Sequence, residues 1–479
     1  MTFLFYDLET TGTDPVFDQV CQFAAIRTDH SLNEIERFER FIRLRPDVIP
    51  SAAALVRTQR SISDILRGEL EYEVMRDIHR LVNTPGTISI GYNSLDFDDD
   101  FLRFGFYRNL LPPYDHQWRN GCGRADLLPL VVLYRHFASD LLEWPEGDKG
   151  ISLRLEDLSS ANRCADGRAH NAMADVRACL NLARRMHERL NLWQEGMWYF
   201  CRQNFAATIS KLPILPCIDG SDYRIGVMLR HRFGSAKNYV APVLFLCRSE
   251  GYPNKTYWLQ LDRANLREKM VAREWDAVLT SKTDGDQRIV RPPTSPRVST
   301  DMAEIANANL VWLCNESAYL DNLRDYARAF RWPPVPNVDP DASLYPRGFR
   351  SGQEDVECRH FHDSPPEQRS ALLQDFSHPI DRTLALRLLA RNYDERSGDR
   401  EYQEYLGRAR GDGPCYDHRG CRKRTRKDAL AELAQEEESP ELDDAQRIIL
   451  TEMRDWIESS ADFGRSLSWM GNRRDVTHA

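Results

Sequence analysis

The sequence predicts an α/β domain followed by a β-rich domain and an all-helical domain. Strand-like apolar runs alternate with amphipathic helical stretches up to about residue 190, which is typical of an α/β domain. The middle of the chain holds short β-branched runs between turn dipeptides, and the last part shows helical spacing throughout. We therefore predict domains at residues 1–190, 191–335 and 355–465, with a linker at 336–354 and a polar tail at 466–479.

The first region begins with strands. The strand-like runs are Phe3–Tyr6, Val20–Thr28, Arg37–Leu44 and Ile88–Tyr92. Helical stretches lie between and after them, at Ser61–Val82, Asp98–Leu110, Asp126–Leu142 and Ala169–Leu190. Because three early strands precede a helix–strand–helix order, we expect a mixed sheet with helices packed on it.

The second and third regions differ in periodicity. Strands are expected at Tyr239–Leu246, Thr256–Leu261 and Asn309–Leu313. The prolines of residues 332–336 predict an extended linker, because adjacent prolines favour a chain without internal hydrogen bonds. Helices are expected beyond it, at Ser370–Phe376, Pro379–Asn392, Arg400–Ala409, Lys427–Glu437 and Asp443–Ser459.

Composition excludes several classes of protein. The chain is 42% hydrophobic and 29% charged, and no run approaches the ~20 apolar residues of a membrane span. The first residues lack the basic segment of a signal peptide, so we expect a cytoplasmic protein. We also expect it to be a monomer. The net charge of −9 argues against a protein that coats nucleic acid, although it leaves room for a local basic groove.

The cysteines predict no disulfide framework. Their number, eleven, is odd and their spacings are scattered. Cys415 and Cys421 flank His418, which is compatible with zinc, but a CxxC pair and an evident fourth ligand are missing. We therefore expect a reduced loop there.

Two acids follow the first apolar strand. Asp7 and Glu9 are two residues apart, so their side chains point to the same face of the strand. Neighbouring carboxylates at the end of a buried strand repel each other, and a divalent cation removes that repulsion. The residues Thr10, Thr11 and Gly12 then predict a tight turn where a substrate approaches the backbone closely.

Further candidates lie at two helix starts. Asp98 opens a helix after the strand at Ile88–Tyr92, where it either caps the helix or serves a site. Asp175 lies in the first turns of a later helix, and His170 stands five residues before it. A histidine of near-neutral pKa can take a proton from water, whereas a lone histidine is more often an exposed loop residue.

Together these residues supply what phosphodiester hydrolysis needs. Two cations held ~3.5–4 Å apart can activate a water and stabilise the leaving 3′-oxygen. Oxygen ligands favour Mg²⁺, with Mn²⁺ able to substitute. We expect metal binding by Asp7, Glu9, Asp98 and Asp175, with Asp7 bridging two ions, and general-base catalysis by His170.

This pattern resembles the DnaQ-like exonuclease superfamily, in its branch with four acids and a histidine. The segments Asp7–Gly12, Asn93–Asp98 and His170–Asp175 are similar to its three motifs. Further segments resemble the bacterial exodeoxyribonuclease I family. They are Phe23–Asp29, Gly91–Asn93, Phe106–Asn109, Leu153–Leu158, Tyr239–Pro242, Tyr319–Leu323 and Leu384–Tyr393.

The resemblance carries several implications. It implies an RNase H-like exonuclease domain, an SH3-like β-rich domain and a helical domain around a groove for single-stranded DNA. It also implies processive 3′→5′ removal of mononucleotides, a role in DNA repair, and docking of the acidic C-terminal tail of the single-stranded DNA-binding protein. Residues 411–440 do not match the family, and Asn315–Ser317 lack the basic character that an acidic tail would require.

Single-stranded DNA requires a positive groove with aromatic platforms. Our candidates for substrate binding, beside the turn at Thr10–Gly12, are Arg108, Arg124, Arg154, Lys237 and Tyr239. Phe233 and Trp258 are expected to pack in the core, and the basic run Arg422–Lys427 is expected to be a solvated face or, as the alternative, to touch DNA. An RNA-trimming or proofreading exonuclease remains the nearest alternative function, and a catalytically dead nucleic-acid-binding scaffold a more distant one.

Overall fold

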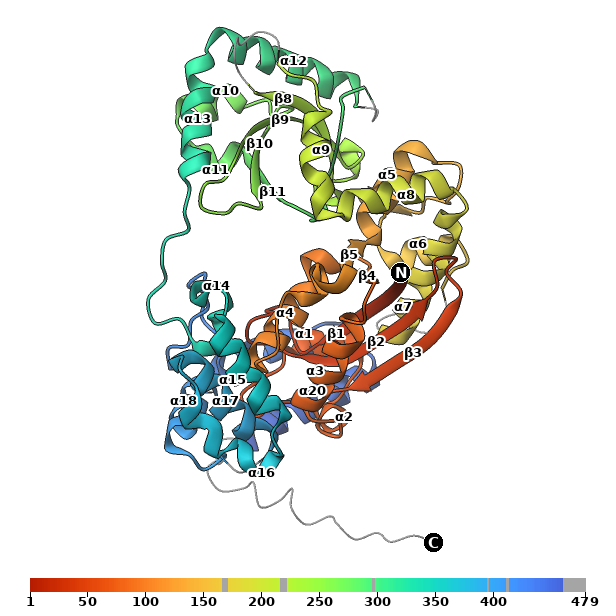
Figure 1. Cartoon of the computed structure of the whole chain (residues 1–479). Helices are drawn as coiled ribbons and strands as arrows, with labels where there is room; N and C mark the ends of the chain where they lie inside the picture. Colours follow the sequence, from red (N-terminus) through yellow and green to blue (C-terminus); the bar gives the residue numbers. More distant parts are fainter. Residues whose placement is uncertain (166–170, 216–221, 295–297, 394–395, 411–412, 460–479) are drawn as a thin grey trace.

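The computed structural model describes residues 1–165, 171–215, 222–294, 298–393, 396–410 and 413–459. The β-rich domain lies at one end, and the α/β domain and the helices of residues 344–410 lie side by side below it (Figure 1). Among the helices of the described residues, none has both the length and the apolar character that crossing a membrane requires.

The α/β domain is built on a mixed five-stranded sheet, as predicted. Its strands are β1 (Thr2–Thr10), β2 (Val20–Thr28), β3 (Glu34–Phe41), β4 (Thr87–Gly91) and β5 (Gly123–Asp126). Their order is β3-β2-β1-β4-β5. The first three strands pair antiparallel, whereas β4 pairs parallel with β1 and β5. The sheet therefore places β1 at its centre.

Helices cover both faces of this sheet. They are α1 (Ala52–Thr58), α2 (Ile62–Leu66), α3 (Glu71–Val82), α4 (Asp98–Arg108), α5 (Leu127–Phe137), α6 (Leu155–Ala161) and α7 (Ala172–His187). Phe3 and Phe5 of β1 pack with α5 and α7, whereas Leu4 and Tyr6 pack with α3 and α4. This alternation along the strand puts Asp7 and Glu9 on the face of α7.

The single helix predicted over Ser61–Val82 is wrong, because two helices occupy it. Residues between them pair with the end of β3 instead: the Glu69 N–H donates to the Phe41 carbonyl at 2.8 Å. At Gly68 a Cβ would lie 2.5 Å from the backbone of Ile42, so only glycine fits that approach. The helix is interrupted because the chain returns to the sheet.

The β-rich domain contains an antiparallel five-stranded sheet. Its strands are β8 (Arg224–Leu229), β9 (Val240–Arg248), β10 (Lys255–Gln260), β11 (Leu279–Thr283) and β12 (Ile289–Arg291), in the order β11-β10-β9-β8-β12. The helices here are α9 (Phe205–Ser210), α10 (Leu266–Val271), α11 (Trp275–Val278), α12 (Thr300–Asn315) and α13 (Ser317–Ala329), whereas α8 (Leu190–Phe200) packs against α5 and α7 of the α/β domain. Trp258 is fully buried, as expected.

The strand predicted at Asn309–Leu313 is wrong, because these residues lie in α12. Ser299 caps that helix by accepting from the Met302 N–H. The buried positions of α12 are Met302, Ala306, Asn309 and Leu313, whose spacing follows one helical face. The short apolar run was compatible with either structure, and the longer helical spacing decides it.

An extended segment joins α13 to the C-terminal helices (Figure 1). The helices that follow are α14 (Leu344–Arg347), α15 (Gly352–Asp363), α16 (Pro366–Arg369), α17 (Pro379–Asn392), α18 (Arg400–Arg410), α19 (Arg426–Glu437) and α20 (Asp444–Ser459). The expected linker at 336–354 is partly helical, and its Ala342 and Leu344 are buried against the α/β domain. Ser370–Phe376 forms a short 3₁₀ helix, Ala371–Asp375.

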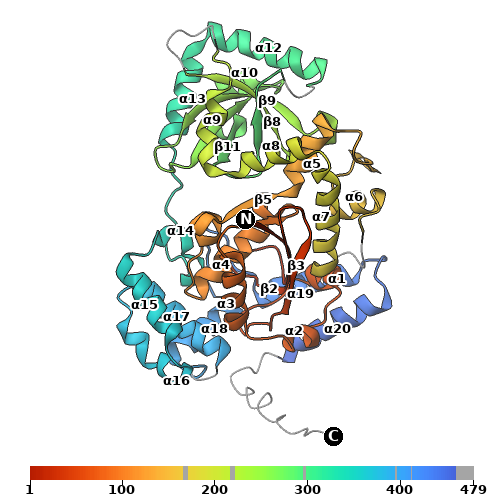
Figure 2. The same ribbon diagram turned by 45° about the vertical axis from the view of Figure 1, so that its right-hand side comes forward.

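The last two helices belong spatially to the α/β domain. Figure 2 shows α19 and α20 beside α1 and α2. Part of the basic run Arg422–Lys427 forms ion pairs with the α/β domain instead of facing solvent. Lys423 is buried against Asp47, and Arg424 lies 3.3 Å from the Asp18 carboxylate. These contacts correct the expectation of a solvated face for this part of the run.

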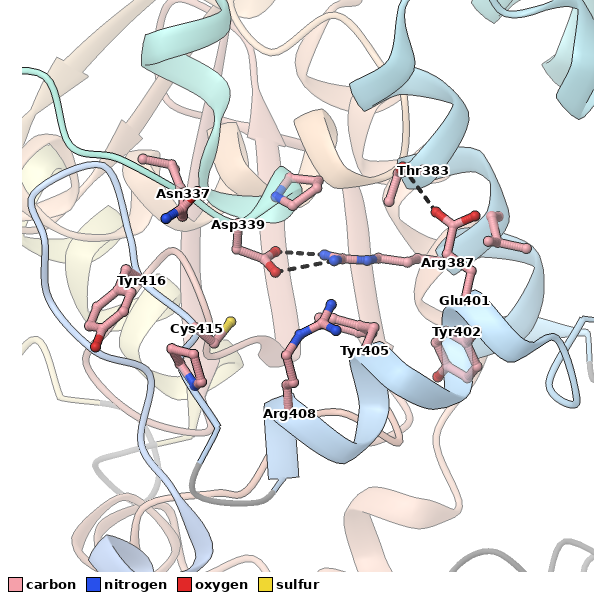
Figure 3. A pocket seen from close by; sticks show the side chains of 14 residues that line it. Asn337, Asp339, Thr383, Arg387, Glu401, Tyr402, Tyr405, Arg408, Cys415 and Tyr416 are labelled. Atoms are coloured by element: carbon pink, nitrogen blue, oxygen red, sulfur yellow. Dashed lines mark hydrogen bonds and ion pairs between the residues drawn. The ribbon is translucent and has the colours of Figure 1, made fainter.

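A pocket of about 470 Å³ lies where residues 337–340 meet α17 and α18 (Figure 3). Arg387 reaches across it to Asp339, with Nη2 at 3.1 Å from Oδ2. A second carboxylate, that of Asp341, lies 3.1 Å from the same guanidinium. These buried charges neutralise one another. They therefore connect α17 to residues 339–341 and hold this part of the structure together.

The cysteine prediction is corrected at one position. Cys314 is disulfide-bonded. The other described cysteines are free, including Cys415 and Cys421. His418 stacks on Phe104 rather than joining the cysteines in a metal site.

Candidate functional site

Three acids predicted from the sequence meet at the end of β1. Asp7 and Glu9 lie on the strand, and Asp175 lies in the first turn of α7. Asn171 caps that helix, its side chain accepting from the Ala174 N–H at 3.3 Å. One ligand oxygen from each of Asp7, Glu9 and Asp175 lies within 4.8 Å of the others. Acids some 170 positions apart in the sequence thus form one cluster.

Asp98 lies beside this cluster and comes from the segment after β4, the strand next to β1 in the sheet. It is the first residue of α4 and is 5% exposed. Its charge raises the pKa of Asp7, and the backbone of Leu8, the residue between Asp7 and Glu9, acts to lower the pKa of Asp98 itself, so its carboxylate lies beside the end of β1. Asp98 therefore lies against β1, although it is not one of the three acids that meet within 4.8 Å. His170 falls outside the described residues.

The carboxyl groups hold their protons unusually strongly. Burial, followed by the charges of Asp98, Glu9 and Asp175, raises the pKa of Asp7 well above its usual value. Burial and then the Asp175 charge raise the pKa of Glu9 to about 7. Burial likewise raises the pKa of Asp98. Buried like charges of this kind are stabilised when a cation is bound between them.

The donor set fits a hard divalent cation. All the candidate ligand atoms are carboxylate oxygens, which suit Mg²⁺ and Mn²⁺. In the described part of the chain, this is the one group of three or more acidic, histidine or cysteine side chains close enough to share a metal. The Cys415–Cys421 loop does not form a second one.

A cleft of about 420 Å³ opens beside the acids. Two domains line it, with the residues Asp7, Arg57, Tyr92, Asn93, Leu128, Leu153, Arg154, Leu155, Glu156, Asp175, His231 and Tyr239. His231 and Tyr239 come from the β-rich domain. An ion pair between Arg232 and Asp96, 3.0 Å long, joins the same two domains near the cleft. The β-rich domain therefore supplies one wall of the site.

Sequence reasoning missed Arg57. It lies in the last turn of α1, and its charge lowers the pKa of both Asp7 and Glu9. The N–H of Ser51, the cap of α1, donates to the Thr11 carbonyl at 2.7 Å, which ties the helix to the turn after β1. No local motif marks Arg57, because its place in the cleft depends on how α1 packs.

The predicted turn at Thr10–Gly12 is held by hydrogen bonds of its threonine side chains. The Thr10 hydroxyl donates to the Gly12 carbonyl at 2.7 Å, and the Thr11 hydroxyl accepts from the Gln19 N–H at 3.0 Å. A Cβ at Gly12 would lie 2.1 Å from the Asp18 carboxylate. Glycine is needed there because a side chain packs against its backbone.

Two of the predicted DNA-binding arginines are structural. Arg108 is 1% exposed and donates to the Val16 carbonyl at 2.9 Å. A side chain enclosed in this way offers no surface to DNA, which corrects the prediction for Arg108. Arg124 lies 2.5 Å from the buried Asp99, in a cluster with Arg103. Its charge serves to neutralise that carboxylate.

The other predicted contacts lie at or near the cleft. Arg154 lines it, with a side chain 68% exposed and 2.6 Å from Glu156. Tyr239 lines it as well and donates its hydroxyl to the Ile151 carbonyl. Lys237 is partly exposed and paired with Asp262 at 2.5 Å. The charge best placed to meet a phosphate from this set is therefore that of Arg154.

Comparisons with known proteins identify the family. Residues 4–183 match the family model described as Exonuclease. The chain is 30% identical to exodeoxyribonuclease I of Escherichia coli K12 over 441 residues, which covers 85% of this chain and 88% of that protein. Its fold matches the solved exonuclease I of Methylocaldum szegediense, with a TM-score of 0.81 and 26% identity over 96% of this chain and 99% of the other.

A third comparison concerns a ligand-bound structure. The zinc-bound complex of E. coli exonuclease I with single-stranded DNA shares the fold, with a TM-score of 0.80 and 24% identity over 96% of this chain and 99% of that one. Since the sequence match to the E. coli protein spans most of both chains, the relationship extends beyond the nuclease domain. The chain belongs to the exodeoxyribonuclease I family of DNA exonucleases.

Proposed function

We propose that this protein removes nucleotides from the 3′ end of single-stranded DNA by metal-dependent phosphodiester hydrolysis. The observation that carries the proposal is the meeting of Asp7, Glu9 and Asp175 within 4.8 Å, with Asp98 against the same strand. Family membership supports the polarity and the substrate. A solved relative of the same fold binds zinc and single-stranded DNA together.

The four acids are the proposed metal ligands. Asp7, Glu9, Asp98 and Asp175 would hold two Mg²⁺ ions, with Mn²⁺ as a substitute. Bound ions of this kind supply activation of a water and stabilisation of the leaving oxygen. The raised pKa values of Asp7, Glu9 and Asp98 support this assignment, because such groups ionise at lower pH once a cation compensates their charge.

His170 is the proposed general base. It directly precedes Asn171, the cap of the helix that carries Asp175. An imidazole of ordinary pKa is half-protonated near pH 6.5, so it can accept the proton of the attacking water at neutral pH. Its position in the sequence, at the entrance of α7, supports this role.

The cleft supplies the proposed DNA contacts. Arg57 and Arg154 would bind phosphates near the acids, and His231 and Tyr239 would contact the sugar or base from the β-rich wall. Lys237 would extend the positive path. We further propose an SH3-like character for the β-rich domain, a monomeric enzyme of the cytoplasm that acts in DNA repair, and docking of the single-stranded DNA-binding protein's acidic tail.

A degradation assay tests the proposal. The substrate is a single-stranded DNA oligomer labelled at its 5′ end, with an RNA oligomer of equal sequence and a blunt duplex as comparisons. We expect products that shorten from the 3′ end in Mg²⁺, release of mononucleotides, and no reaction with a chelator. Faster degradation of the RNA would favour an RNA-trimming enzyme, and DNA binding without any cleavage would favour a scaffold.

A further inference from the structure

A glutamine of the β-rich domain reaches into the second nuclease motif. Gln287 lies between β11 and β12 and is 3% exposed. Its Nε2 donates to the Asp126 Oδ2 at 2.6 Å and to the Asn93 Oδ1 at 3.0 Å. Both acceptors belong to the α/β domain. Gln287 is therefore a buried hydrogen-bond donor shared between two domains.

Asp126 organises the turn that follows β4. Its carboxylate also accepts from the N–H groups of Asn93 at 2.8 Å, Leu95 at 3.0 Å and Leu128 at 3.0 Å. With Gln287 it receives donors from both domains, and it is fully buried. A buried carboxylate that loses a hydrogen-bond donor carries a large desolvation penalty, so loss of the Gln287 donor destabilises this position of Asp126.

The turn that Asp126 holds leads directly to Asp98. Asn93 has φ of 62°, a left-handed conformation that costs energy for a residue with a side chain. A 3₁₀ turn at Ser94–Asp96 follows, and α4 begins at Asp98. Asn93 also lines the cleft with Asp7 and Asp175. Any shift of the turn therefore moves both the cleft wall and the start of α4.

Gln287 itself is held firmly by its own domain. The preceding Asp286 accepts from the N–H groups of Thr283 at 2.7 Å and Arg288 at 2.9 Å, and it pairs with the buried Lys282 at 2.8 Å. Two residues after Gln287, Ile289 is fully buried in a hydrophobic cluster shared with Leu130 of α5. The β-rich domain thus presents the Gln287 amide from a rigid loop.

We infer that Gln287 is a positioning residue: by hydrogen bonding to Asp126 and Asn93 from the β-rich domain, it fixes the turn that sets Asp98 against β1. The inference rests on the proposed function and deepens it, because it makes the second domain part of the metal-binding centre. Residues that orient metal ligands typically change metal affinity or activity ~10–100-fold when they are replaced.

The test compares Gln287→Met with Asn309→Leu in the full-length protein. Methionine keeps the length of glutamine but donates no hydrogen bond. Asn309 is an apt control, since its buried amide also makes two hydrogen bonds, to the carbonyls of Leu261 and Arg263, but wholly within the β-rich domain. We measure Mn²⁺ affinity by calorimetry, kcat and KM on a single-stranded DNA oligomer, and thermal unfolding.

We expect Gln287→Met to weaken Mn²⁺ binding and to lower kcat by about tenfold or more, with KM for the oligomer changed less than about twofold. Asn309→Leu should leave both unchanged even if it unfolds at a lower temperature. Equal Mn²⁺ affinity and kcat in the two variants would overturn the positioning role. An inactive wild-type protein would instead contradict the proposed function, while Mn²⁺ binding would still report on Gln287.

A second variant separates hydrogen bonding from side-chain volume. Gln287→Glu keeps the shape but places a carboxylate beside that of Asp126. We expect Mn²⁺ binding at neutral pH to be weakened at least as much as in Gln287→Met. Because a glutamic acid that keeps its proton could still donate, the decisive result is wild-type affinity in both Gln287→Glu and Gln287→Met, which would show that no donor is needed at this position and would overturn the inference.

Discussion

The guanidinium of Arg391 lies 3.0 Å from the carboxylate of Asp47, which joins α17 to the loop between β3 and α1. Asp47 also accepts from the Tyr405 hydroxyl at 2.8 Å and lies 3.3 Å from Arg45. Although burial alone would raise the pKa of Asp47, the Arg391 and Arg45 charges hold it well below its usual range. The C-terminal helices are thus attached to the nuclease domain through buried charges.

Arg391→Met should destabilise the protein strongly. Removing one partner of a buried ion pair leaves an uncompensated charge and costs roughly 3–5 kcal/mol. Urea unfolding measures the loss, and Arg400→Met is the control, because the Arg400 side chain is 92% exposed in its pair with Glu404. If both variants unfold at the same urea concentration, the Arg391 network does not stabilise the junction.

Arg154→Ala should weaken DNA binding without unfolding the protein. Its exposed side chain lines the cleft, so its loss should raise the Kd for an oligomer and lower the slope of log Kd against log salt by about one. Arg108→Met should lower the stability of the protein rather than act on DNA binding directly, since the Arg108 side chain is enclosed. Fluorescence anisotropy at several salt concentrations distinguishes them. An unchanged salt slope in Arg154→Ala would remove Arg154 from the DNA path.

The acids were predictable because their positions depend on local geometry. Strand alternation places Asp7 and Glu9 on one face, and the structure has them on the face of α7. Asp98 and Asp175 stand at helix starts, which the sequence marks by the change from strand to helix spacing. The mixed sheet followed from the order of the strands. Periodicity of two and of 3.6 residues thus predicts most of this site.

The missed features depend on contacts between distant segments. Arg108 and Arg154 look alike in the sequence, yet one is buried and the other exposed, because α4 packs inside the domain. Arg57 enters the cleft only through the packing of α1. The helices α19 and α20 were assigned to the C-terminal domain, but they lie on α1 and α2. No local sequence pattern predicts such contacts between distant segments.

Asp175→Asn should abolish cleavage and retain DNA binding. An amide keeps the shape of the side chain but removes one of the charges that would attract the cations. Asp140→Asn is the matched control, since Asp140 is exposed and pairs with Arg189 at the surface. Cleavage rates and oligomer affinity are measured in the same Mg²⁺ buffer. Appreciable cleavage by Asp175→Asn would exclude Asp175 as a required ligand.

His170→Ala should slow cleavage by roughly 10²–10⁴, the usual contribution of a general base. The affinity for Mn²⁺ should stay unchanged, because His170 is not among the proposed ligands. Single-turnover rates at several pH values measure the effect, and the acidic limb of the wild-type profile should be missing in the variant. A near-wild-type rate would remove His170 from the mechanism.

The metal-free protein should lose stability as pH rises through the neutral range, because folding raises the pKa of Glu9 from 4.5 to about 7. Between these values the folded state holds a proton that the unfolded chain has released, so unfolding becomes easier with rising pH, by up to about 3 kcal/mol in total. Asp7 and Asp98 act in the same direction.

Urea unfolding in a chelator, at about pH 5 and about pH 8, measures this loss, and Glu9→Gln is the comparison. The variant should lose less stability over the same interval, and added Mg²⁺ should stabilise the wild-type protein more at the higher pH, because the cation competes there with fewer protons. Identical pH slopes for wild-type and Glu9→Gln would mean that Glu9 ionises normally in the folded protein. The cation would then bind without relieving a repulsion between these acids.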